Sequence, residues 1–131
     1  MNRTKVVLAM LGTALFAAGA RAAEEPRNPA AEKPAVVEYT VVAVEMDGAK
    51  FWIPNDLIVY EGDPIKLNLV NNIKSEPNTH GYAIDEFGVK QVVARGETRT
   101  VVFTASKAGL FKIYCQQHPK HIGGRLLVLK R

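Results

Sequence analysis

One segment decides the fold expected of this chain: residues 110–121, LFKIYCQQHPKH. Every second side chain from Phe111 onward in its first half is apolar, which is typical of a β-strand with one buried face. Phe111, Ile113 and Cys115 share that face, so we expect the cysteine sulfur to start on the apolar side of a strand end. Residues 116–124 then form a connecting loop, because paired glycines end them before the next apolar run.

The same strand-and-turn pattern continues through the rest of the chain. Short alternating or β-branched segments are separated by turn signals rich in glycine, proline, asparagine and aspartate. The segments expected to be extended lie at residues 36–45, 51–53, 57–60, 65–70, 81–85, 89–94, 98–104, 110–115 and 125–130. No helical period of useful length is present. We therefore predict an all-β sandwich or barrel of about seven to eight strands, with Trp52 in its core.

The N-terminus has the features of a secretory signal. Arg3 and Lys5 precede an apolar run over residues 6–18, and the tripeptide ARA at 20–22 matches a small-x-small cleavage site. We predict a signal peptide over residues 1–22 and export to the periplasm. The apolar run is short for a bilayer and no stop-transfer pattern follows, so no stable membrane span is expected after cleavage. An uncleaved N-terminal anchor is the alternative.

Composition divides the chain after the signal peptide. Residues 23–35 are rich in proline and charge and carry no large apolar side chain, which predicts a flexible tether before a folded domain at 36–131. The whole sequence has 17 basic and 13 acidic residues, and three of the basic residues fall within the signal peptide, which leaves 14 against 13. No cluster of Lys and Arg with interleaved aromatics remains, so nucleic acid is not expected as a partner.

Soft metal-binding side chains are concentrated in one place. Cys115 is the single cysteine, His118 and His121 follow it at steps of three, and His80 is the third histidine of the chain. A thiolate with imidazoles suits copper or zinc better than magnesium or calcium. Other readings stay open, because a lone cysteine is often a small core residue and loop histidines are often uninvolved. His80 is also compatible with a hydrogen-bonded histidine at a strand end.

These residues bring the chain close to a known family. The runs at 59–63, 80–89 and 115–120 resemble cupredoxins, the copper-binding Greek-key β-sandwiches, and look most like the nitrosocyanin-like mononuclear copper proteins. They are also similar to the copper domains of cytochrome oxidase subunit II and nitrous-oxide reductase. The resemblance implies a Greek-key sandwich with one copper ion, since a binuclear centre needs two thiolates and only one cysteine is present.

The resemblance also implies a role for each donor. Cys115 is the thiolate ligand and His118 an imidazole ligand. His80 falls where ordinary cupredoxins place their first histidine and nitrosocyanin carries a glutamate. His121 corresponds to the second loop histidine of nitrosocyanin or to the axial group elsewhere. The usual axial methionine is missing, because Met46 is the only methionine after the signal peptide and lies far from the loop.

From this ligand set we expect a carrier of single electrons rather than an enzyme. A redox protein partner is expected to dock near His118, Pro119 and Ile122, next to the metal. Two alternatives remain: a nitrosocyanin-like site that binds or converts a small molecule such as nitric oxide, and copper storage or delivery. A zinc site built from the same residues is less favoured.

Overall fold

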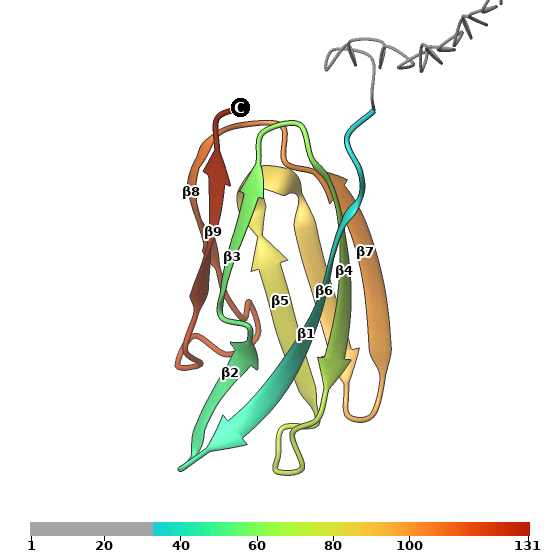
Figure 1. Cartoon of the computed structure of the whole chain (residues 1–131). Helices are drawn as coiled ribbons and strands as arrows, with labels where there is room; N and C mark the ends of the chain where they lie inside the picture. The colour runs from blue at the N-terminus through green and yellow to red at the C-terminus, as the bar shows by residue number, and fades with distance from the viewer. Residues whose placement is uncertain (1–32) are drawn as a thin grey trace, which may run out of the picture. The chain divides into compact units, whose positions relative to one another are not determined.

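The computed structural model describes residues 33–131, which form nine strands and one short 3₁₀ helix (Figure 1). The strands are β1 (Val37–Met46), β2 (Ala49–Ile53), β3 (Asp56–Tyr60), β4 (Pro64–Asn71), β5 (Thr79–Ile84), β6 (Val89–Ala94), β7 (Thr98–Thr104), β8 (Gly109–Ile113) and β9 (Gly124–Leu129), and the 3₁₀ helix η1 is Asp85–Phe87. The predicted signal peptide at 1–22 and the tether up to residue 32 lie outside the described residues. Within the described part, no helix is long and apolar enough to cross a membrane.

The strands pair in an order that differs from their order in the chain. One sheet has the order β2-β1-β4-β7, a second has β3-β9-β8, and β5 pairs with β6. The β1–β4 and β3–β9 pairs are parallel, whereas the other strand pairs are antiparallel. The chain therefore crosses repeatedly between layers, as a sandwich requires (Figure 1). The all-β prediction is confirmed, with nine strands in the described residues against the seven to eight expected.

The core lies between the sheets and follows the alternation of the strands. On β4 the side chains of Ile65, Leu67 and Leu69 are fully buried, while the residues between them are partly exposed. β1, β3 and β9 contribute their inward residues in the same way. Truncating one such side chain, as in Leu67→Ala, costs about 2–5 kcal/mol of stability through lost contacts and the cavity left behind. This closed core gives the site at its edge a stiff support.

β8 ends earlier than the alternation indicates. An extended segment was expected through Cys115, but Ile113 is the last residue to pair with β9. The next residue, Tyr114, instead forms an isolated antiparallel bridge with Ala83 of β5. Ile113 and Cys115 are nevertheless both buried, so the inward orientation predicted for the cysteine is confirmed. The chain leaves one strand pair here and begins to contact another.

Candidate metal centre

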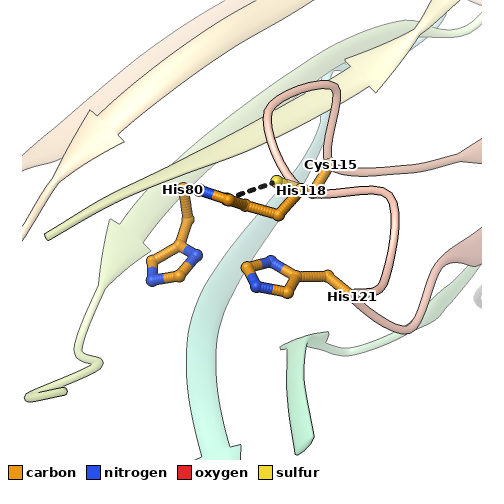
Figure 2. Close-up of side chains that lie close together, drawn as sticks. All are labelled: His80, Cys115, His118 and His121. Atoms are coloured by element: carbon orange, nitrogen blue, oxygen red, sulfur yellow. Dashed lines mark hydrogen bonds between the residues drawn. The ribbon is translucent and has the colours of Figure 1, made fainter. Parts of the chain in front are cut away.

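Four side chains from two distant parts of the chain meet at one end of the sandwich. His80 comes from the start of β5, whereas Cys115, His118 and His121 come from the loop between β8 and β9. One potential ligand atom from each residue lies within 4.8 Å of the others. Figure 2 shows the three imidazoles and the thiol grouped together. The structure thus brings together all four residues singled out from the sequence.

His80 is the most deeply buried member of the cluster. Its side chain is 1% exposed, and neither ring nitrogen has a hydrogen-bond partner. Burial lowers the pKa of His80 to about 4, and the positive charges of protonated His121, His118 and Lys50 contribute to this shift. The nearby Pro77 carbonyl opposes this shift only weakly, because it does not reach hydrogen-bond geometry. A buried imidazole without a partner is costly, and a metal ion would satisfy one of its two nitrogens.

Cys115 is held from two sides. Its sulfur accepts a hydrogen bond from the backbone N–H of Gly81 at 3.2 Å and lies 3.4 Å from Nδ1 of His118. Sulfur and nitrogen bound at about 2.3 and 2.0 Å to one tetrahedral ion lie about 3.5 Å apart. The observed separation therefore fits two donors that share an ion.

The loop after Cys115 presents its histidines at successive turns. The N–H of His118 donates to the Cys115 carbonyl at 3.3 Å, and the N–H of His121 donates to the His118 carbonyl at 3.0 Å. These turns place all three side chains on one side of the loop. The N–H of Ile122 then donates to the Lys50 carbonyl at 3.0 Å, which ties the loop to β2.

Two glycines close the loop against the body of the domain. A Cβ on Gly123 would lie 2.7 Å from the Ile113 carbonyl oxygen, and one on Gly124 would lie 1.8 Å from the Asn55 carbonyl oxygen. No larger side chain fits at either position without moving the backbone. These glycines therefore give the loop a close approach to the strands, and with it a defined position for His121.

His121 is the more accessible of the imidazoles that carry a shifted pKa. Burial lowers its pKa, and His118 and Lys50 add to the effect when charged. Its ring centroid lies 4.9 Å from that of His80 and 4.6 Å from that of His118. Because protonation of His80 and His121 is disfavoured, both rings are available as neutral nitrogen donors near neutral pH.

Sequence reasoning missed the contacts that surround Cys115. It placed Trp52 in the core, where the side chain is 5% exposed, but not the bond that its indole N–H donates to the Gly81 carbonyl at 2.9 Å. It also missed Gln116, whose amide packs against Gly81. A glycine inside a strand marks a close backbone approach, and Gly81 was the one available signal.

The arrangement can do one thing well, which is to hold a soft or borderline metal ion. One sulfur and three imidazoles are a ligand set for copper or zinc. A sequence profile of the cupredoxin-like domain family matches residues 7–128. The chain belongs to this family. The predicted resemblance to cupredoxins is confirmed.

Curated relatives match about half of this cupredoxin-like chain. Nitrous-oxide reductase of Cupriavidus necator is 41% identical over 64 residues, which are 47% of this chain and 10% of the relative. Nitrous-oxide reductase of Pseudomonas fluorescens is 30% identical over 79 residues, which are 57% of this chain and 12% of the relative. The matched region thus spans about a tenth of the length of these relatives.

Solved structures support the fold assignment. Copper nitrite reductase from Nitrosomonas europaea is 21% identical with a TM-score of 0.62, over 74% of this chain and 42% of that one. The Cu-containing nitrite reductase from Thermus scotoductus is 25% identical with a TM-score of 0.59, over 74% of this chain and 28% of that one. The cupredoxin-like chain is therefore similar to a portion of larger proteins.

Proposed function

We propose that this cupredoxin-like protein is exported, binds one copper ion and transfers single electrons between protein partners. The observation that carries the proposal is the cluster around His80, a buried imidazole with two unpartnered nitrogens and three further donors within 4.8 Å. The family and the donor set both favour copper. Copper supplies a stable one-electron couple, and a Cys-His₂ set with a further ligand is typical of electron-transfer sites.

Each donor has a separate task in this proposal. Cys115 supplies the thiolate, and His80 and His118 supply neutral nitrogen donors. His121 completes the set from the more accessible side of the loop. Because His80 is fixed in the core and the loop is tied to β2 through Ile122, the ligands would keep nearly the same positions in both oxidation states. Small rearrangement favours fast electron exchange.

The proposed docking surface comprises His118, Pro119 and Ile122. Ile122 is 51% exposed, and a shallow hollow of about 300 Å³ is lined by Gln117, His118, Pro119, Lys120 and His121. An exposed apolar side chain beside a metal ligand suits a transient redox complex, since such interfaces are small. The partner would approach the ion through the ring of His118.

The first experiment is copper loading of the mature protein. We expect one copper per chain, a thiolate-to-copper absorption band and the electron paramagnetic resonance signal of one Cu(II) ion. Cys115→Ser should remove the absorption band while the fold is kept. Binding of zinc in preference to copper, or a band that survives in the serine variant, would contradict the proposal.

A cavity next to the cluster favours a second candidate function, binding of a small molecule. It has a volume of about 260 Å³ and is lined by Lys112, Tyr114, Cys115, Gln116, Pro119, His121 and Gly123. If His121 does not bind the ion, this side offers an open coordination position, and three protein ligands with an open position favour chemistry. Azide or nitric oxide added to the copper protein would then change its spectra, whereas a four-ligand carrier would not respond.

Export is tested separately. We propose cleavage after Ala22, so that the mature protein carries the tether at 23–35 and the domain at 36–131. Protein recovered from the periplasmic fraction should have an N-terminus at or within a residue of Ala23. An intact N-terminus in a membrane fraction would instead favour the uncleaved anchor.

A further inference from the structure

Gly81 is held by three contacts, one from Trp52 of β2 and two from the adjacent residues Cys115 and Gln116. Its N–H donates to the sulfur of Cys115 at 3.2 Å, and its carbonyl accepts a hydrogen bond from Nε1 of Trp52 at 2.9 Å. The side chain of Gln116 covers its Cα. Gly81 therefore links the indole of Trp52 on β2 to the sulfur of Cys115 in the metal-binding loop.

Gln116 explains why this position is a glycine. A Cβ on Gly81 would lie 2.2 Å from Oε1 and 2.6 Å from Cδ of Gln116. The amide is not free to move away, because its Nε2 donates to the Gln91 carbonyl of β6 at 2.8 Å. The backbone of Gly81 has no left-handed φ, so space rather than conformation excludes a larger residue.

The side chain of Trp52, which donates to the Gly81 carbonyl, is itself held in place by packing. Its ring is 5% exposed and lies edge-on to Tyr82, with centroids 5.4 Å apart and planes at 88°. The Tyr82 hydroxyl has no hydrogen-bond partner, so Tyr82 contributes packing and not a polar contact. The indole N–H is thus the polar group that β2 directs at Gly81.

We propose that Trp52 is a positioning residue for the thiolate of Cys115, which acts by holding Gly81 so that its N–H points at the sulfur, with Gln116 closing the opposite side. The inference rests on the proposed function, in which Cys115 binds copper. An N–H donated to the sulfur stabilises its negative charge. Weakening that bond raises the energy of the sulfur electrons and favours Cu(II) over Cu(I).

The test compares Trp52→Phe with Tyr82→Phe in the copper-loaded protein. Trp52→Phe keeps an aromatic ring but removes the donor to Gly81. We expect its thiolate-to-copper band to move to longer wavelength and its reduction potential to fall. Tyr82→Phe removes a hydroxyl without a partner from the neighbouring ring, and both quantities should stay at the wild-type value. Identical spectra and potentials for all three proteins would overturn the proposal.

The amide resonance of Gly81 separates this inference from the proposed function. In metal-free protein, the Gly81 proton should move upfield in Trp52→Phe, because its bond to sulfur is weaker, and should not move in Tyr82→Phe. This readout needs no copper, so a wild-type protein without a thiolate band would refute the copper site and still leave the positioning role tested. An unmoved Gly81 resonance in Trp52→Phe would overturn the positioning role alone.

A pair of variants tests the contact between Gly81 and Gln116 without changing Trp52. Gly81→Ala forces the new methyl group against Gln116, and should shift both the amide resonances of residues around position 81 and the thiolate-to-copper absorption band. Adding Gln116→Ala vacates that space, so the band should return toward its wild-type position. A double variant as strongly shifted as Gly81→Ala alone would contradict the role assigned to Gln116.

Discussion

Ala83 of β5 and Tyr114, just after β8, exchange a pair of backbone hydrogen bonds. The N–H of Ala83 donates to the Tyr114 carbonyl at 2.9 Å, and the N–H of Tyr114 donates to the Ala83 carbonyl at 3.1 Å. Cys115 directly follows this bridge, and His80 lies three residues before it on the other strand. The bridge therefore sets the register that brings the buried histidine and the thiol to one place.

The buried imidazole of His80 makes the stability of the metal-free protein depend on pH. Its pKa is lowered from 6.5 to about 4, so between these values the unfolded chain binds a proton that the folded protein does not. The contribution of His80 to the free energy of unfolding is therefore constant above pH 6.5. As the pH drops from 6.5 toward 4, the free energy of unfolding falls by about 3 kcal/mol at most. Urea unfolding at several pH values measures this slope.

The control for this prediction is His80→Leu, which removes the titrating group from the same buried position. Most of the slope between pH 6.5 and 4.5 should vanish, and His121, Glu38 and Asp56, whose pKa values are also lowered, contribute to the remainder. Because an apolar side chain replaces a polar one without partners, the metal-free variant should be at least as stable as the wild type at low pH. Equal slopes in the two proteins would contradict the assignment.

Metal binding should stabilise the folded protein strongly. An ion that binds only the folded state adds about 2.7 kcal/mol when its free concentration is a hundred times Kd. For a domain of this size that corresponds to a rise in Tm of roughly 10–20 °C. Thermal unfolding with copper and then with excess chelator measures the gain and its reversal. In Cys115→Ser the gain should be much smaller, and an equal gain would show that copper binds elsewhere.

The sequence predicted the class of fold and the four residues of the metal-binding cluster. It did not predict the hydrogen bonds that hold these residues in place. Alternation identified the inward faces of β4 and β8, because a strand with one buried side has a period of two. The clustering of Cys115 with His118 and His121 was visible, since three donors within one loop are local. His80 was predicted only through the resemblance to cupredoxins, because its position depends on the pairing of Ala83 with Tyr114, a contact between segments distant in the chain.

Contacts to the backbone were the least predictable part. The bond from Trp52 to Gly81 joins residues 29 positions apart and ends on a carbonyl, which every residue possesses. No pattern of side chains marks such an acceptor. The early end of β8 has the same origin, since Tyr114 is extended in either case and only its partner changes.

Asn71 should prove essential for the loop that leads to His80. The side chain is 1% exposed, continues the inward face of β4 and donates to the carbonyls of Asn78 and Val93 at 3.2 and 3.0 Å. It also accepts from the N–H of Ile73 at 3.0 Å. Asn71→Ala removes these three hydrogen bonds and leaves the buried N–H of Ile73 without its partner, so we expect a loss of about 2–4 kcal/mol in denaturant unfolding, together with weaker copper binding.

Asn68→Ala is the matched control on the same strand. Asn68 bonds to Glu38 and Thr100 at the surface, at 2.6 and 2.9 Å. Water replaces such partners, so the loss should stay within about 0.5 kcal/mol and copper affinity should not change. A comparable loss in both variants would show that the burial of Asn71 is not what matters.

The identity of the fourth donor should set the reduction potential. A thioether is softer than an imidazole and favours Cu(I), so His121→Met should raise the potential by about 59 mV for each tenfold change in relative affinity for the two oxidation states. The thiolate band should persist, because Cys115, His80 and His118 are unchanged. Redox titration followed at that band gives the answer, and an unchanged or lower potential would mean that His121 is not a ligand.

The proposed docking surface predicts a loss of electron-transfer rate without a change in the metal site. Ile122 is 51% exposed beside the loop histidines, and a charge placed there would have to be desolvated in the complex. Ile122→Lys should therefore slow the second-order reaction with a redox protein about tenfold or more, while the absorption spectrum and the potential stay constant. Val102→Lys is the control, because Val102 is 66% exposed on β7, a strand that contributes no donor to the cluster. Stopped flow at several salt concentrations measures both rates. Equal slowing by both substitutions would mean that the effect comes from net charge. Slowing by Ile122→Lys alone would locate electron exchange at the loop that carries His118 and His121.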